Sequence, residues 1–144
     1  MPKLLLDIVT AERLVSSEEI DVLVAPGVDG ELAILSHHAP LLTFLKPGEI
    51  RVINNGEENE IAVSGGVMEV MPDKVTILAD TAERAEEIDE ERAEIALKRA
   101  EERLASAPAE MDLERALASL RKSQARLKVA RRRNRGLGRE RTSP

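Results

Sequence analysis

Short runs of alternating apolar and polar residues fill the chain from residue 3 to residue 80. A period of two places successive side chains on opposite faces of a β-strand. Asn55-Gly56 and Asp29-Gly30 lie between runs and indicate tight turns, because these residue types tolerate positive φ. Several runs are apolar on both faces, which favours two packed sheets in a sandwich or barrel. Predicted strands cover residues 4–9, 13–18, 19–26, 27–35, 48–54, 60–64, 65–71 and 74–80.

The apolar period changes to three and four after residue 88, which predicts a helix over residues 89–104. Asp89 suits the N-cap of this helix, and Ile88 is placed to pack against its first turn. Residues 106–110 end the helix, and Asp112 is the predicted cap of a second one. Each helix spans about sixteen residues, or about 24 Å, and the two form an antiparallel hairpin. Their apolar faces contain Ala93, Ala96, Leu97, Ala100 and Leu104, and then Leu113, Ala116, Leu117, Leu120 and Leu127.

Alanine is frequent on both helix faces and buries little surface, at about 0.8 kcal/mol per methyl-sized group. Isolated helices of this length are marginal in water. We therefore expect a hairpin that can open or move, docked on a more stable β body. Residues 131–144 contain six arginines and two glycines without an apolar period, and residues 134–144 are predicted to form a disordered basic tail.

The composition argues against several classes of function. Phe44 is the only aromatic residue, so the bases of a nucleic acid have almost no stacking platform. The absence of cysteine excludes disulfides, a thiolate nucleophile and a sulfur-ligated metal. A chain of 144 residues predicts one domain, or one domain with an appendage. The apolar run Leu4–Leu6 is too short for a signal peptide or a membrane span, so we expect a cytoplasmic protein that reaches a membrane only through a partner.

The charge is divided between an acidic body and a basic arm. Residues 1–110 hold 24 acidic and 10 basic residues, whereas residues 111–144 hold 3 acidic and 11 basic residues. The arm should be attracted to an acidic surface, which could be nucleic acid, anionic lipid or a carboxylate-rich protein. An adaptor that binds nucleic acid through basic helices is one function compatible with this pattern, although the acidic body and the single Phe oppose it.

Two segments of the chain resemble a known family. They read GELAILSHHAPLLTFLKPGEIRV (30–52) and AVSGGVMEVMPDKVTILADTAERAEEID (62–89). Together with the order of strands before helices, they make residues 3–130 similar to the epsilon subunit of bacterial F-type ATP synthase. The resemblance implies an α+β protein, with a flattened N-terminal β-sandwich of about ten strands and a C-terminal antiparallel two-helix hairpin. The implied boundaries are 1–84 for the sandwich, 85–133 for the hairpin and 134–144 for the tail.

The resemblance also implies a role. Epsilon subunits bind the gamma subunit and the c-subunit ring in the central stalk, as peripheral proteins on the cytoplasmic face of the cell membrane, and couple proton-driven rotation to ATP synthesis. They have no catalytic site, and their helices switch between a folded-down hairpin and an extended form that inhibits ATP hydrolysis by the alpha/beta head. No nucleic-acid partner and no required cofactor are implied. In the extended form, the residues expected to meet an acidic segment of the beta subunit are Arg115, Arg121, Lys122, Arg126, Lys128 and Arg131.

Some members of this family bind ATP as a regulatory ligand through an (I/L)-D-x-x-R-A motif at the start of the first helix. The positions at which this chain matches those members are Glu83, Ile88, Asp89, Arg92, Ala93, Arg99 and Arg126. Lys122 stands where the binding members have arginine, and lysine cannot make a planar, two-pronged contact with phosphate. The alternative is that Asp89 only caps the helix and that the arginines only solvate its surface.

The remaining motifs favour structural roles. Gly65-Gly66 indicates a tight bend or bulge between two strands. His37-His38 lacks a third metal ligand nearby, so a loop role is favoured over a metal site. GVDG (27–30) lacks the G-x-x-x-x-G-K-[ST] pattern, so ATP hydrolysis by this chain alone is not expected. EEIDEE (86–91) has no EF-hand spacing and is interpreted as a solvated linker.

Overall fold

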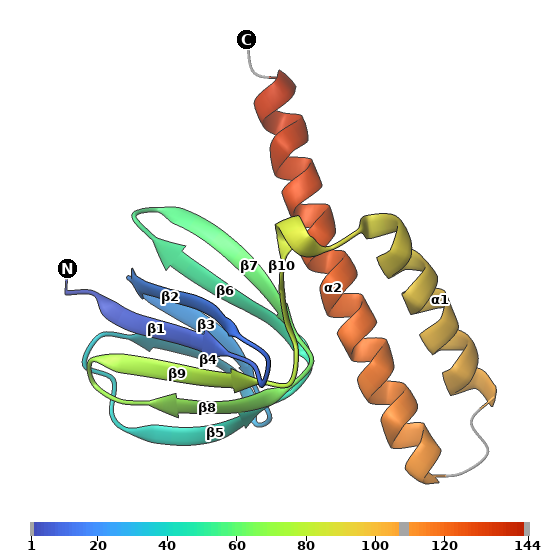
Figure 1. Cartoon of the computed structure of the whole chain (residues 1–144), viewed down its shortest axis with the longest axis horizontal. Coiled ribbons are helices and arrows are strands. Elements are labelled where there is room, and N and C mark those ends of the chain that lie inside the picture. Colours follow the sequence, from blue (N-terminus) through green and yellow to red (C-terminus); the bar gives the residue numbers. More distant parts are fainter. Residues whose placement is uncertain (1, 107–109, 143–144) are drawn as a thin grey trace.

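The computed structural model describes the backbone of residues 2–106 and 110–142, and the side chains of residues 2–106 and 113–132. Within these residues, ten strands precede a 3-10 turn, η1 (Ala85–Glu87), and two helices, α1 (Glu90–Ser106) and α2 (Glu110–Thr142) (Figure 1). The strands are β1 (Leu4–Val9), β2 (Leu14–Ile20), β3 (Val22–Gly27), β4 (Gly30–Leu35), β5 (Leu41–Leu45), β6 (Gly48–Asn54), β7 (Glu57–Val63), β8 (Gly66–Val70), β9 (Lys74–Ala79) and β10 (Ala82–Arg84).

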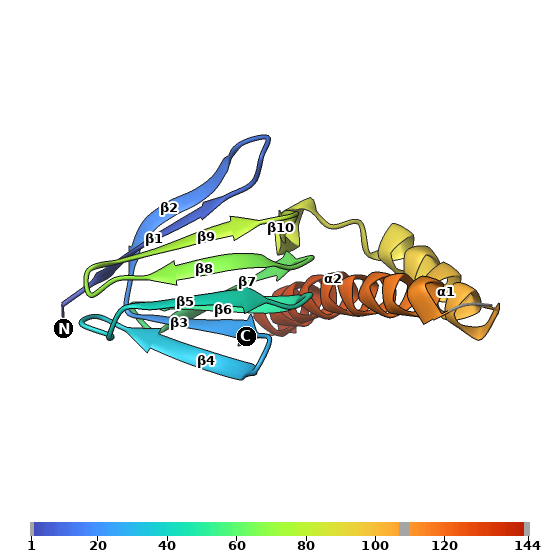
Figure 2. The same ribbon diagram turned by 90° about the horizontal axis from the view of Figure 1, so that it is seen from below.

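The strands form one continuous sheet that folds over on itself into a sandwich (Figure 2). The sheet order is β10-β7-β6-β3-β5-β8-β9-β1-β2, and β4 pairs with β3. Strands β1 and β9 are parallel, whereas the other pairs are antiparallel. Alternate side chains point inward and fill one apolar core, whose fully buried members include Leu4, Ile34, Ile50, Met68 and Ile77. The predicted order of a β-sandwich followed by two helices is confirmed.

Two backbone features that the sequence predicted are a tight turn between β6 and β7 and a bend before β8. Asn55 and Gly56 connect β6 to β7 with φ values of 53° and 80°, which a two-residue hairpin of this type requires. Gly66 begins β8 with a φ of 151°, and a Cβ at this position would overlap the carbonyl oxygen of Leu78. The expected bend at Gly65-Gly66 is therefore confirmed, because only glycine fits there.

Two strands were not predicted from the sequence. β5 reads LLTFL, which is nearly continuous in apolar residues and does not alternate. It forms because its backbone pairs with β8, while Leu42 and Phe44 remain largely exposed. β10 has only three residues and exists because they pair with β7. In both cases long-range pairing determines the strand, and local periodicity carries little signal.

The first helix begins where the sequence predicted. The backbone N–H of Arg92 donates a hydrogen bond of 3.1 Å to Oδ1 of Asp89, so Asp89 is the N-cap of α1. Ile88 is buried beside Ala93, as expected for a residue that packs against the first turn. The helix ends at Ser106, which is two residues beyond the predicted end.

The second helix differs from the prediction at both ends. It begins at Glu110, so Asp112 lies inside its first turn and is not the cap. It has 33 residues instead of about sixteen, and residues 134–142, which were predicted to be disordered, are helical; residues 143–144 lie outside the described part. Arginine is a good helix former and extending an existing helix costs little, so the two glycines there reduce helix stability by about 1 kcal/mol each without ending the helix.

The hairpin attaches to the sandwich through α2, which lies along β6 and β7, while α1 packs on the far side of α2 (Figure 1). The apolar cluster at this attachment is separate from the sandwich core and consists of Ala62, Ile88, Ala93, Ala125, Leu127, Val129 and Ala130. Alanine supplies four of these seven side chains, so the buried apolar area is small. No described helix is long and apolar enough to cross a membrane.

Candidate functional site

A surface cavity of about 510 Å³ opens between α1 and α2. This volume lies within the range of small-molecule sites. Five of the side chains that line it are basic and none of its described lining residues is acidic, so the cavity suits a ligand with several negative charges. The lining residues are Arg92, Ile95, Ala96, Arg99, Ala100, Arg103, Ser119, Lys122, Ser123 and Arg126.

One of these basic residues already has a partner in the sandwich. Nε of Arg126 lies 2.8 Å from Oε1 of Glu83, and Nη2 donates a hydrogen bond of 3.2 Å to Oε2 of the same carboxylate. The Nε–H makes no aligned hydrogen bond, so the shorter contact is mainly Coulombic. Both side chains are about one-quarter exposed, which screens the pair less than a fully solvated one. The pair joins α2 to β10 at the edge of the cavity.

The cavity brings together half of the ATP-binding residues that the resemblance suggested. Arg92 and Arg99 line it from α1, and Lys122 and Arg126 line it from α2. Glu83 is not in the lining, but it forms an ion pair with Arg126, which is. The remaining three, Ile88, Asp89 and Ala93, are not in its lining: Asp89 caps α1, and Ile88 and Ala93 are buried under α2.

Three polar lining residues were not among the candidates. Arg103 follows Arg99 by four positions on α1, and Ser119 and Ser123 are four positions apart on α2. Residues with this spacing lie on the same face of a helix. Spacing could have identified Arg103 from Arg99, and Ser123 and Ser119 from Arg126, which follows them by three and seven positions.

A second set of ion pairs joins α2 to β6 and β7. Oε1 of Glu49 lies 3.2 Å from Nζ of Lys128 and 2.8 Å from Nη1 of Arg132, which is also 3.5 Å from Oε1 of Glu60. Burial raises the pKa of Glu60, and the neighbouring carboxylates of Glu58 and Glu49 raise it further, whereas Arg132 opposes them. The basic face of α2 thus lies on an acidic strip of the sandwich, defined by Glu49 and Glu60.

Two family sequence models match adjacent parts of the chain. The ATP synthase delta/epsilon chain β-sandwich domain matches residues 3–85, and the long α-helix domain of the same chain matches residues 86–131. The chain belongs to the ATP synthase delta/epsilon family. This membership makes it a subunit of an ATP synthase complex.

Relatives and solved structures agree with this family. The chain is 56% identical over 137 residues to the "ATP synthase epsilon chain" of Dehalococcoides mccartyi, covering 94% of this chain and 97% of the relative. It is 55% identical over 131 residues to the chain of that name from Herpetosiphon aurantiacus, covering 90% and 96%. A chain in the OSCP/F1/c-ring structure of Euglena gracilis mitochondrial ATP synthase has the same fold, with a TM-score of 0.76, 23% identity and coverage of 90% and 82%.

The resemblance suggests that six basic residues meet an acidic partner in the extended form, and here, with α2 packed on the sandwich, they lie in several different environments. Arg126 and Lys128 bind carboxylates of the sandwich, and Arg131 binds Glu94 of α1 at 3.2 Å. Lys122 faces the cavity between the helices. Within the described part of the chain, Arg115 and Arg121 are exposed and make no ion pair.

The delta/epsilon sandwich also exposes an apolar face. Phe44 of β5 pairs with Val67 of β8, which pairs with Leu78 of β9, so the three side chains lie on one face of the sheet. Phe44 is 65% exposed and Leu78 is 56% exposed. Leu42, two residues before Phe44, extends the same face and is 69% exposed. These four residues, called the apolar face below, form an exposed patch of the kind that marks interaction sites.

The histidine pair of this family member lies in the loop before β5. His38 places Nδ1 2.7 Å from the carbonyl oxygen of Ala39, and His37 has a φ of 67°. Within residues 2–106 and 113–132, no group of three or more possible metal ligands is present.

Proposed function

We propose that the chain is the epsilon-type subunit of the central stalk of a proton-translocating ATP synthase. In this role it turns with the rotor, couples rotation to ATP synthesis and slows ATP hydrolysis through its helices. It contributes no catalytic residue and is held peripherally at the cytoplasmic face of the cell membrane by its partners. The family membership over residues 3–131 supports this proposal.

The sandwich is the docking part in this proposal, and the gamma subunit and the c-subunit ring are its partners. The supporting observation is the apolar face, where Leu42, Phe44 and Leu78 are more than half exposed. Burying such side chains in an interface contributes about 1.5–3 kcal/mol each. The test is sedimentation of the purified chain with a gamma–c-ring complex that lacks it, and failure to co-sediment would contradict the docking role.

The hairpin is the brake in this proposal, and the observation that carries it is the weak attachment of α2. The attachment combines an alanine-rich cluster with ion pairs from Arg126, Lys128 and Arg132 to the sandwich. The three cations are 23%, 57% and 35% exposed, so these pairs remain partly open to solvent, and surface pairs contribute about 0–1 kcal/mol each. An acidic segment of the beta subunit would replace Glu49 and Glu83 as partner when the helices extend toward the alpha/beta head. The two states would then differ by only a few kcal/mol, as a switch requires.

The proposed regulatory ligand is ATP, bound in the cavity between α1 and α2. Arg92, Arg99 and Lys122 would neutralise its phosphates from two helices. Arg126 would share its charge between Glu83 and the ligand. Because both helices contribute to this cavity only in the folded-down hairpin, bound ATP would favour that state.

Titration of the full chain with ATP is expected to show saturable binding that depends on these charges. Arg92→Gln should weaken binding about tenfold, because one phosphate partner is lost. Lys122→Arg should tighten it several-fold, because a guanidinium makes two-pronged phosphate contacts. Isothermal titration calorimetry measures both, with Arg115→Gln as the control, since Arg115 is an exposed α2 residue outside the cavity. Equal affinity of Arg92→Gln and Arg115→Gln would rule out this site.

A further inference from the structure

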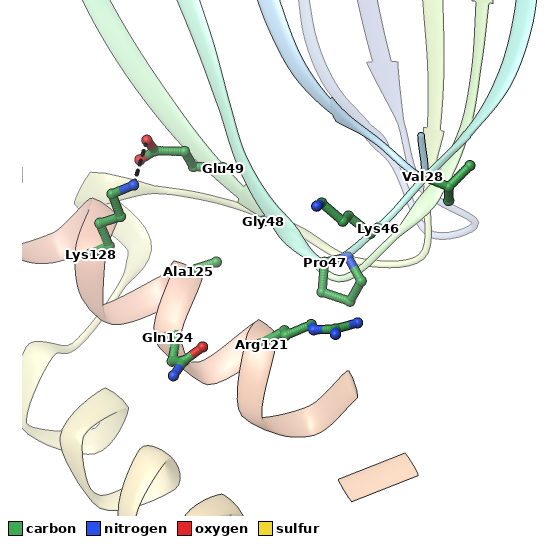
Figure 3. A pocket seen from close by; sticks show the side chains of 9 residues that line it. All are labelled: Val28, Lys46, Pro47, Gly48, Glu49, Arg121, Gln124, Ala125 and Lys128. Carbon is green, nitrogen blue, oxygen red and sulfur yellow. Dashed lines mark ion pairs between the residues drawn. The ribbon is translucent and has the colours of Figure 1, made fainter. Parts of the chain in front are cut away.

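A second cavity, of about 500 Å³, lies on the opposite side of α2, between this helix and the sandwich (Figure 3). Val28 and Pro47 form its apolar wall, and Lys46, Arg121 and Lys128 bring positive charge to it. Arg121 and Lys122 are consecutive on α2, so their side chains leave the helix about 100° apart. Lys122 faces α1, whereas Arg121 faces the sandwich.

The charges in this cavity are only partly neutralised. Glu49 is its single acidic lining residue, and it lies at one end, 3.2 Å from Lys128 (Figure 3). Glu49 also pairs with Arg132 at 2.8 Å. At the other end, Lys46 and Arg121 lie on either side of the Pro47 turn (Figure 3). Within the described residues neither of them has an ion-pair partner. Two cations without ion-pair partners among the described residues therefore line the same end of this cavity, on a protein whose formal net charge is -6.

Backbone hydrogen bonds hold in place the sandwich residues that line this end of the cavity. The N–H of Lys46 donates a 2.9 Å hydrogen bond to the carbonyl oxygen of Pro26, and the N–H of Val28 donates one of 3.0 Å to that of Phe44. These bonds tie the turn between β5 and β6 to the turn between β3 and β4. A ligand at Lys46 would thus meet a preorganised surface, which reduces the entropy lost on binding.

We propose that this cavity is a second anion site, which takes a small phosphate-bearing molecule between Lys46 of the sandwich and Arg121 of α2. The guanidinium of Arg121 presents a planar fork to phosphate oxygens, and the ammonium of Lys46 adds a compact charge. The size of the cavity favours a small molecule over a protein segment. The ligand touches both the sandwich and α2, so it stabilises their contact and acts independently of the cavity between α1 and α2.

The test is an amide NMR titration of the full chain with pyrophosphate at low ionic strength. The Lys46 and Arg121 signals are expected to shift and saturate, and the double variant Lys46→Gln/Arg121→Gln is expected to bind at least tenfold more weakly. Arg115→Gln, which removes an exposed α2 charge outside both cavities, should remain within twofold of the unaltered chain.

A second double variant separates the two cavities. Arg92→Gln/Lys122→Gln removes charge only from the cavity between the helices and should leave the Lys46 and Arg121 shifts intact. Loss of those shifts in this variant, or unchanged affinity in Lys46→Gln/Arg121→Gln, would overturn the proposal. Tighter binding of a hexaglutamate peptide than of pyrophosphate would also overturn it, because the surface would then fit an acidic protein segment.

Discussion

Replacing Phe44 with glutamate is expected to weaken binding of the chain to a gamma–c-ring complex about 100-fold or more. Phe44 is 65% exposed in the isolated chain, on the same sheet face as Val67 and Leu78. Burial of Phe contributes about 1.5–3 kcal/mol, and a buried carboxylate without a partner adds a desolvation penalty. Equilibrium binding of the labelled chain to the complex measures the loss.

The stability of the variant distinguishes lost docking from lost folding. Surface substitutions usually change the free energy of unfolding by less than about 0.5 kcal/mol, so Phe44→Glu should unfold in urea at nearly the same concentration as the unaltered chain. Leu113→Glu is a matched control, because Leu113 is an exposed apolar residue of α2, 41% exposed, and lies outside the apolar face. Normal binding by Phe44→Glu would show that the rotor subunits dock elsewhere.

Those parts of the fold that depend on neighbouring residues could be predicted from the sequence. The Asn55-Gly56 turn needs positive φ at two adjacent positions, and the Asp89 cap bonds a backbone N–H three residues later. The period of the apolar residues identified α1 for the same reason. β5 and the length of α2 could not be predicted in this way. The strand depends on pairing with β8, and the last turns of the helix contain no apolar period.

The residues of the candidate site also fall into two groups, those that local sequence could identify and those that depend on long-range contacts. Arg92 and Arg99 could be assigned to one helix face by their spacing, and the motif that contains Arg92 was local. The pairing of Arg126 with Glu83, 43 positions apart, could not be found from spacing. The contact of Glu49 with Lys128 and Arg132 is also long-range, and it shows that the protein's own acidic sandwich neutralises part of the basic face of α2. A run of basic residues in a sequence predicts that the partner surface is acidic. It does not show whether that surface belongs to another chain or to the same one.

Removing residues 89–144 is expected to leave assembly and coupling of the complex largely intact and to raise its rate of ATP hydrolysis several-fold. The sandwich core is separate from the cluster under α2, so the sandwich should fold without the helices. The chain that reaches the alpha/beta head is then absent, and the proposed brake is lost. ATPase assays on complexes rebuilt with either chain measure the effect, and an unchanged rate would refute the brake while leaving the stalk role intact.

A substitution that weakens the attachment of α2 should act in the opposite direction. Glu49→Gln removes the carboxylate that binds Lys128 and Arg132, which destabilises the folded-down hairpin by about 1 kcal/mol and favours the extended state about fivefold. Hydrolysis by the rebuilt complex should therefore slow. Glu31→Gln is the control, because Glu31 pairs at 3.3 Å with Arg51 on the surface of the sandwich and makes no ion pair with α2 among the described residues. If Glu49→Gln instead raised hydrolysis as the deletion does, the acidic strip would be part of the inhibited state, and the folded-down hairpin could not be the permissive one.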